Sequence, residues 1–164
     1  MIRALLLGAA LALTGCAGKT CEPVTMDSHT ERLLRDNDLM QARLLITSGP
    51  RDALELADAL LVRIADQDPR GEVAFYRAVS LIRQRGALPD ILALLEDAAE
   101  QRHPHALALL YKIHNEPYLA PRADRARALR YRQAYAELDV AKSGYPSFPR
   151  ALMVVDQLVN PPRR

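Results

Sequence analysis

Residues 89–113, PDILALLEDAAEQRHPHALALLYKI, carry the pattern that decides the fold. Apolar residues recur at intervals of three and four on both sides of Pro104. They are Ile91, Leu94, Leu95 and Ala98 before the proline and Leu107, Leu110 and Ile113 after it. This spacing is typical of the buried face of an α-helix, and proline is tolerated in a helix's first turn. The stretch therefore predicts two short helices, over 89–101 and 104–115, joined by a tight turn.

The same periodicity runs through the chain from residue 28 onward, without the alternation that is typical of strands. It predicts further helices over 28–46, 52–66, 70–85, 122–142 and 149–159. Ser28 and Glu31 have the spacing of a capping box at the start of the first one. Short connections favour antiparallel neighbours. We therefore expect an all-α fold of antiparallel helix pairs, with 52–66 beside 70–85, 89–101 beside 104–115, and 122–142 beside 149–159.

The opening stretch also resembles a known repeat. Residues 93–101, followed by Pro104, Ala106, Leu110 and Tyr111, resemble the helix junction of Sel-one-like repeats, relatives of the tetratricopeptide repeat. Residues 128–134 resemble the start of the repeat's other helix. Arg102 stands where the family places Gly, and residues 116–121 lack its Gly-rich turn. The resemblance covers roughly residues 89–158 and implies a short tetratricopeptide-like (Sel-one-like) α-solenoid, within a helical-repeat domain over 28–160.

The amino-terminal residues follow a different pattern. Arg3 precedes an apolar stretch over 4–13, and small residues stand directly before Cys16, as in a secretory signal peptide. The apolar stretch is about half of the roughly 20 residues that a membrane-spanning helix needs. Leu13-Thr14-Gly15-Cys16 resembles the lipobox of bacterial lipoproteins. The resemblance implies removal of residues 1–15 and covalent diacylglycerol and an N-acyl chain on Cys16. An ordinary signal peptide with a chance cysteine is the alternative.

The lipobox resemblance also implies a location. In Gram-negative members of the family, an Asp after the lipidated cysteine marks retention in the inner membrane, and this chain has Ala17 there. We therefore expect a lipid-anchored protein of the outer membrane that faces the periplasm, with residues 16–27 as lipidated cysteine and flexible tether. Cys21 is then the odd cysteine in an oxidising compartment. It pairs with a partner, is acylated, or has no role.

Two groups of side chains are candidates for binding a partner. The first is the arginine group Arg122, Arg125, Arg127, Arg130 and Arg132. It either receives an acidic partner through bidentate contacts or forms a solvated face partly paired with acids. The second is the tyrosine group Tyr76, Tyr111, Tyr118, Tyr131 and Tyr135. It either lines a repeat groove or fills core between helices. The net charge of +2 does not indicate binding to nucleic acid.

The sequence gives little sign of catalysis. His103 and His105 are two residues apart at a helix start and do not share a face, and no acid or cysteine lies near them at zinc spacing. We expect structural or solvent-exposed roles for them and for His114, with no metal and no cofactor beyond the acyl chains. No phosphate loop, nucleophile elbow or zinc-protease motif occurs, and no catalytic residue is assigned.

The expected function is a non-enzymatic scaffold or assembly factor, either pilotin-like or part of a secretion or export complex, that binds another envelope protein. One alternative is a periplasmic hydrolase, or its accessory, acting on peptidoglycan or polysaccharide. Another is an immunity lipoprotein that neutralises a toxin.

Overall fold

All regular structure in the described residues, 26–142 and 146–161, is helical in this computed structural model. The α-helices are α1 (Ser28–Ser48), α2 (Ala53–Arg63), α3 (Glu72–Gln84), α4 (Leu88–Glu100), α5 (Pro104–Asn115), α6 (Arg125–Ala136), α7 (Asp139–Lys142) and α8 (Phe148–Val159), and a short 3-10 turn, η1 (Ala65–Gln67), follows α2. The all-α prediction is confirmed. No helix in these ranges has the length and apolar content needed to cross a membrane. The signal peptide, Cys16, Cys21 and the predicted helix stop at Gly144 lie outside the described residues.

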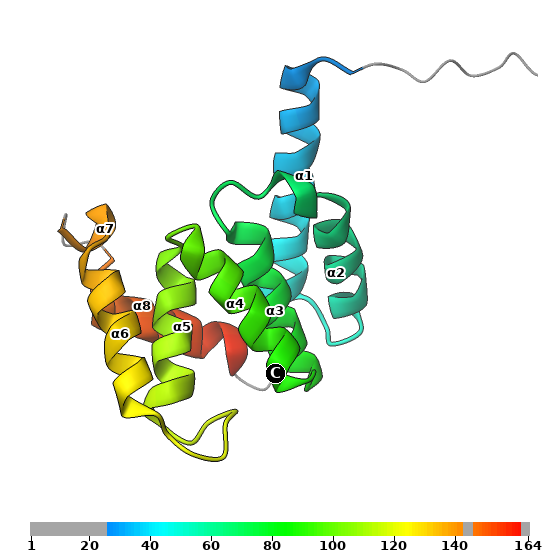
Figure 1. Cartoon of the computed structure of the whole chain (residues 1–164). Helices are drawn as coiled ribbons and strands as arrows, with labels where there is room; N and C mark the ends of the chain where they lie inside the picture. Colours follow the sequence, from blue (N-terminus) through cyan, green and yellow to red (C-terminus); the bar gives the residue numbers. More distant parts are fainter. Residues whose placement is uncertain (1–25, 143–145, 162–164) are drawn as a thin grey trace, which may run out of the picture.

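Three helix hairpins follow one another along the chain (Figure 1). α1 packs most extensively against α2, α3 against α4, and α5 against α6, and the hairpins join through α2 with α3 and α4 with α5. The predicted pairs 52–66 with 70–85 and 89–101 with 104–115 therefore do pack together, but each of these helices packs more extensively on its other neighbour. The predicted pairing rested on the length of the connections, yet α5 packs most closely on α6 across the long connection 116–124. An apolar stripe shows which side of a helix is buried, but it does not determine which other helix packs against that side.

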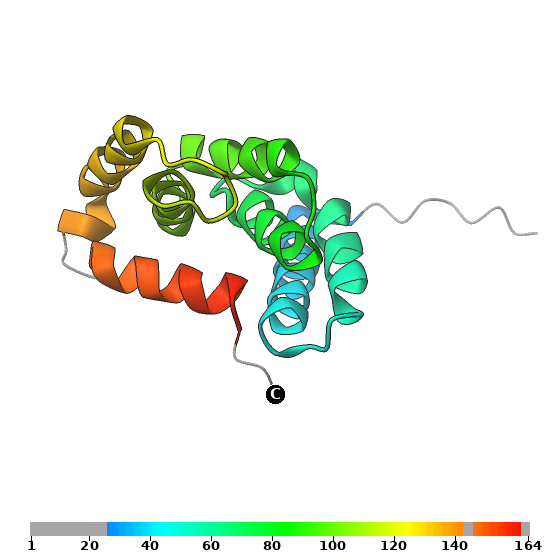
Figure 2. The same ribbon diagram turned by 90° about the horizontal axis from the view of Figure 1, so that it is seen from below.

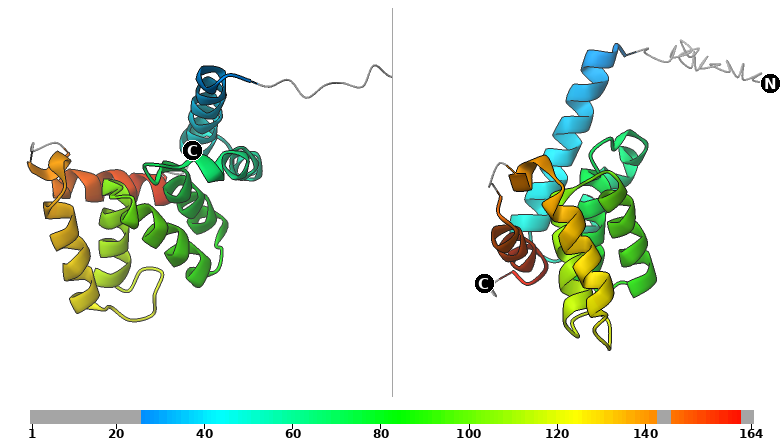
Figure 3. Two further views of the ribbon diagram at one scale, coloured as in Figure 1. Left: turned by 45° about the horizontal axis from the view of Figure 1, so that its top comes forward. Right: turned by 60° about the vertical axis from the view of Figure 1, so that its left-hand side comes forward.

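The last helix also differs from the prediction. α8 crosses α5 at a steep angle and touches α3 and α6, instead of pairing with one long helix over 122–142 (Figures 2 and 3). Its buried residues are Ala151, Val155 and Val159. The ring of Phe148, at its start, lies 5.0 Å from the rings of both Tyr111 and Tyr135. α8 therefore covers one side of the α5–α6 hairpin.

Helix ends explain two further differences from the prediction. The N-cap of α1 is Asp27 and not Ser28, since the Asp27 carboxylate accepts hydrogen bonds from the backbone of His29 and Thr30. The helix expected over 122–142 starts only at residue 125, after the cap Asp124. It is broken between α6 and α7, where Leu138 is turned into the core.

The turn between α4 and α5 shows how the chain accommodates Arg102 where Sel-one-like repeats have Gly. Arg102, at the position where the repeats that this stretch resembles have Gly, has φ of 61°, in the left-handed region that favours glycine. The backbone N–H groups of Arg102 and His103 donate to the carbonyls of Ala99 and Ala98 and close the end of α4. The Arg102 guanidinium donates to the carbonyl of Glu137 at 3.1 Å. This contact between the turn and the end of α6 offsets the backbone cost.

Small residues allow the helices to approach closely. Ala57, Ala78, Ala98, Ala106 and Ala108 are all fully buried. Large side chains fill the space between them, with Phe75, Leu95, Leu109, Leu110 and Ile113 also fully buried. Interiors of this kind tolerate added volume poorly, because close packing leaves no room for it.

Candidate interaction surfaces

The tyrosines predicted to line a groove have different surroundings. Tyr135 is only 1% exposed, and its hydroxyl donates to the carbonyl of Pro146 at 2.7 Å. Burial raises its pKa. Tyr111 packs edge-on against Phe148 of α8. Tyr135 therefore fits the alternative in which the tyrosine rings fill core between helices. α8 covers the side of the α5–α6 hairpin where Tyr111 and Tyr135 contact Phe148.

Tyr131 belongs to a polar cluster that joins α4 to α6. Its hydroxyl and the Arg127 guanidinium both donate to one carboxylate oxygen of Glu96, the arginine at 2.7 Å. Arg127 also donates to the Tyr131 hydroxyl at 3.2 Å, and His114 of α5 stacks on the Tyr131 ring. Burial and the hydrogen bond to Glu96 raise the Tyr131 pKa. Arg127 therefore joins α6 to α4. Of the other arginines in the group, Arg132 lies over the ring of Phe148, at 5.8 Å.

The other four arginines of the predicted group are exposed. Arg122 lies in the loop before α6, outside the helix that was expected to hold it. No ion pair joins any of the four to an acid among the described side chains. Arg125 and Arg132, seven residues apart, share one flank of α6 with Leu129, which is 54% exposed. We call Arg125, Leu129 and Arg132 the basic face.

The histidines occupy structural positions. His103 is 8% exposed, caps α5 by accepting a hydrogen bond from the backbone of Ala106, and lies 4.6 Å from the Phe75 ring. Burial, followed by the charges of nearby cations, lowers its pKa to about 3. Burial also lowers the pKa of His105 and of His114. Within the part of the chain that the structure describes, no group of three or more His, Cys, Asp or Glu side chains could hold a metal ion.

A groove of about 440 Å³ opens between α1 and the end of α2. It is lined by Met26, Glu31, Leu34, Arg35, Asp38, Arg63, Ile64 and Gln67. Asp38 is only 6% exposed, and both of its oxygens accept from Arg63, at 2.6 and 2.8 Å. These bonds raise the Arg63 pKa. The pair ties α1 to α2 at the inner end of the groove, so the carboxylate is already fully engaged.

The sequence reasoning missed the opposite side of α1. Leu33, Met40 and Leu44 are between 56% and 58% exposed, and Asn37 between them is exposed too. We call these four residues the α1 outer stripe. The sequence does contain a sign of this second apolar side. The apolar residues of 28–46 fall on two sides of a helical projection, and only one of these sides can face the core.

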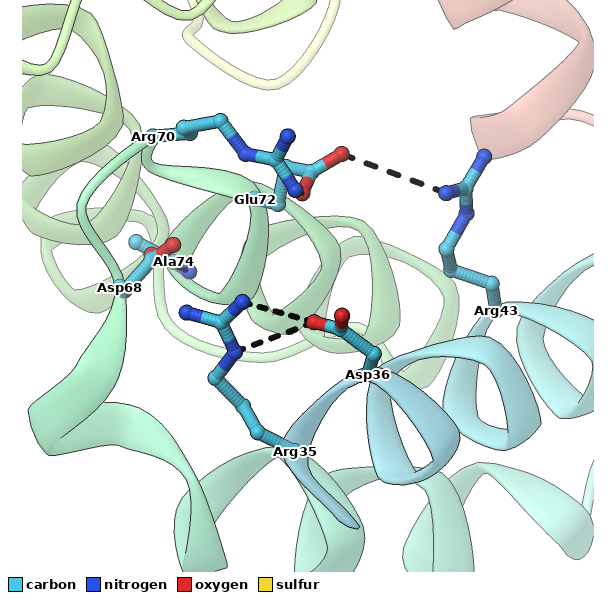
Figure 4. Close-up of polar contacts among 7 residues, drawn as sticks. All are labelled: Arg35, Asp36, Arg43, Asp68, Arg70, Glu72 and Ala74. Atoms are coloured by element: carbon cyan, nitrogen blue, oxygen red, sulfur yellow. Dashed lines mark hydrogen bonds and ion pairs between the residues drawn. The ribbon is translucent and has the colours of Figure 1, made fainter. Parts of the chain in front are cut away.

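Asp36 and Arg43 flank this stripe and belong to a group of charged residues where α1 meets the start of α3 (Figure 4). Asp36 is bound by Arg35 at 2.7 Å. Arg43 lies 4.0 Å from Glu72 of α3 and over the ring of Tyr76, at 5.3 Å. Arg70 binds the same Glu72 at 2.9 Å, and Asp68 accepts from the backbone of Ala74 at the start of α3. Asp36 and Arg43 remain half-exposed despite these contacts.

Comparisons with family models, with curated proteins and with solved structures find no match to this chain.

Proposed function

We propose that this protein is an outer-membrane lipoprotein, anchored through Cys16 and facing the periplasm, that docks another envelope protein without catalysis. The observation that carries the docking role is the basic face of α6, whose two arginines have no acidic partner among the described residues. α1, which the tether would join, and α6 lie at opposite sides of the domain (Figure 1). An anchor at α1 therefore does not occupy α6.

The proposed anchor needs no membrane-seeking surface on the domain. Each buried methylene of an acyl chain contributes about 0.8 kcal/mol to membrane binding, and two or more chains make the attachment lasting. The lipobox resemblance at residues 13–16 supports this attachment. The three successive helix hairpins support the tetratricopeptide-like (Sel-one-like) arrangement, which commonly presents surfaces to other proteins.

The chemistry of the basic face suits a protein partner with an acidic surface. A guanidinium binds a carboxylate through two parallel hydrogen bonds, and Arg125 and Arg132 would provide two such groups about 10 Å apart along α6. Leu129 between them provides an apolar contact. Protein interfaces are enriched in arginine and exclude water around apolar anchors. A component of a secretion or export complex with a matching acidic patch fits this description.

The anchor is tested by Cys16→Ser in the source bacterium, with Cys21→Ser as the matched control. We expect the Cys16→Ser protein to leave the membrane fraction, and the control to stay in it. Membrane association that survives Cys16→Ser would refute the anchor.

The docking role is tested by capture from detergent-solubilised envelopes with the lipidated protein as bait. A single stoichiometric partner should be recovered, and the double variant Arg125→Glu and Arg132→Glu should reduce its recovery by at least about tenfold. The matched control is Arg32→Glu with Arg85→Glu, which reverses two exposed arginines elsewhere. Equal recovery with both double variants would exclude the basic face as the docking surface.

A further inference from the structure

Leu33, Met40 and Leu44 of the α1 outer stripe are the largest group of exposed large apolar side chains on one helix face in the described structure. The members of the stripe, residues 33, 37, 40 and 44, are separated by four, three and four positions. This is the spacing of the a and d positions of a coiled coil, which bring side chains to one seam. The core-facing residues of α1, Leu39, Ala42 and Ile46, lie on the other side of the helix. The stripe thus has the geometry of a second, unused helix-packing face.

We propose that the α1 outer stripe is a homodimer interface, in which α1 packs antiparallel against α1 of a second copy. In an antiparallel seam, a positions face d positions. Leu33 of each copy then faces Leu44 of the other, and Asn37 faces Met40. The proposal goes beyond the docking role above and does not depend on the anchor or on the basic face.

The charges beside the stripe select the second copy as the occupant. Asp36 and Arg43 both precede an a position and lie on the same flank of the seam. In the antiparallel arrangement that pairs Leu33 with Leu44, Asp36 of each copy faces Arg43 of the other, so the two-fold axis creates two ion pairs. A parallel arrangement brings Asp36 near Gln41 and Arg43 near Ser48, and creates none. The surface is therefore self-complementary in one orientation only.

Both charged side chains are exposed enough to reach a second copy. Asp36 is 57% exposed and binds its neighbour Arg35 (Figure 4). Arg43 is 50% exposed and lies 4.0 Å from Glu72 and 5.3 Å from the centre of the Tyr76 ring. Exposed ion pairs of this kind contribute little to stability. Exchanging them for pairs across an interface therefore costs little.

The interface is small, because it consists of one helix against another. Stable complexes usually bury more than about 1,200 Å² in total, so we expect a weak, reversible dimer in solution. Asn37 weakens it further, since a polar residue at a seam position lowers coiled-coil stability while it limits the number of alternative registers.

Sedimentation equilibrium of the purified mature chain tests the interface, at protein concentrations from about 10 μM to 1 mM, the range suited to a weak interface. Cys16→Ser and Cys21→Ser remove lipid and any disulfide between copies. We expect a reversible dimer that Leu33→Glu weakens by more than about tenfold. Leu56→Glu on α2 is the matched control, because Leu56 is 57% exposed and Leu33 is 56% exposed, and it should leave the dimer unchanged. Asn37→Leu should strengthen it.

Charge reversal tests the pairing directly. Asp36→Arg places like charges at both ion pairs and should weaken the dimer, and the double variant Asp36→Arg with Arg43→Asp should restore it. A general loss of helix stability would not be rescued in this way.

The orientation is tested by cysteine cross-linking in the same background. Leu33→Cys mixed with Leu44→Cys should form a disulfide-linked dimer under mild oxidation, whereas Leu33→Cys alone should not. Four outcomes would each overturn the proposal. The chain without these substitutions could stay monomeric at every concentration, or Leu33→Glu and Leu56→Glu could weaken the dimer equally. The double charge reversal could fail to restore the dimer, or Leu33→Cys could link efficiently to itself.

Discussion

Gly71 stands directly before α3, at the point where α3 comes closest to the end of α4. Its φ of 68° lies in the left-handed region, and a Cβ atom added to it would lie 2.8 Å from both the Cα and the carbonyl oxygen of Ala98. Ala98 is fully buried in α4. Gly71→Ala therefore combines two costs, a strained backbone and an overlap with backbone atoms that no side-chain rotation can relieve.

The size of the effect follows from these two terms. A left-handed conformation costs a residue with a Cβ about 1 to 2 kcal/mol, and overpacking in a closed interior typically costs about 1 to 3 kcal/mol. The lower entropy of the unfolded alanine variant returns about 0.4 to 1 kcal/mol. We expect Gly71→Ala to lower the free energy of unfolding by about 3 kcal/mol, measured by urea denaturation followed by circular dichroism.

Gly86→Ala is the matched control. Gly86 lacks a positive φ, and its added Cβ would lie 3.2 Å from the Cβ and 3.3 Å from the Cδ2 and the carbonyl oxygen of Leu81, tight contacts without the overlap found at Gly71. We therefore expect a change within about 1 kcal/mol. Ala98→Gly should not rescue Gly71→Ala, because the overlapping atoms belong to the backbone. If Gly71→Ala proves as stable as the wild type, or if Ala98→Gly restores its stability, the close approach of α3 and α4 is wrong.

Three further predictions concern single side chains. The pKa of His103 is about 3 in the folded chain, against 6.5 for a histidine side chain that is free in water. The unfolded chain therefore takes up a proton below about pH 6.5 that the folded chain does not, and stability should fall by up to about 1.4 kcal/mol per pH unit as the pH drops toward 3. His103→Asn keeps a side-chain acceptor for the cap of α5 and should reduce the loss of stability between pH 7 and pH 5, measured by urea denaturation at both pH values. An equal loss in the variant and the wild type would show that His103 is not the group responsible. Arg102→Ala should lower the stability of the fold by about 1 kcal/mol, because the hydrogen bond to the Glu137 carbonyl is lost. Arg102→Gly loses the same bond but also relieves the left-handed backbone strain, so its stability should stay close to that of the wild type. Equal melting curves for the two variants would refute this prediction. Arg63→Ala leaves the buried Asp38 unpaired and should lower the free energy of unfolding by about 1 to 3 kcal/mol. Asp38→Asn should cost less, because it leaves only the exposed Arg63 without its ion pair. A larger loss of stability for Asp38→Asn than for Arg63→Ala in urea denaturation would refute this prediction.

The helices themselves were predictable because their signals are local. The apolar face of residues 70–85, with Phe75, Ala78, Val79 and Ile82, is buried as predicted. The prolines at the starts of α4, α5 and α8 lie in first turns, where a missing N–H costs nothing. Each of these features depends on residues within one or two helical turns, so a single sequence is enough to find them.

The candidate surfaces were predictable only in part. The arginines of residues 122–132 were found from their density, but the sequence did not separate Arg127, which binds Glu96 of α4, from the exposed Arg125 and Arg132. The break between α6 and α7 has no Gly or Pro to announce it. Tyr135 lies in the core because α8 covers it, and no local pattern predicts where a helix far along the chain will pack.

Hydrophobic spacing alone determined that this chain is all-α, where most of its helices lie, and which side of most helices faces the core. The tertiary structure decided which helices are neighbours, that Arg102 takes a glycine-like conformation, and that one apolar side of α1 stays uncovered. The physical reason is that a helical stripe is set by neighbouring residues along the chain, whereas its partner is chosen by the competing fit of all the helices in three dimensions.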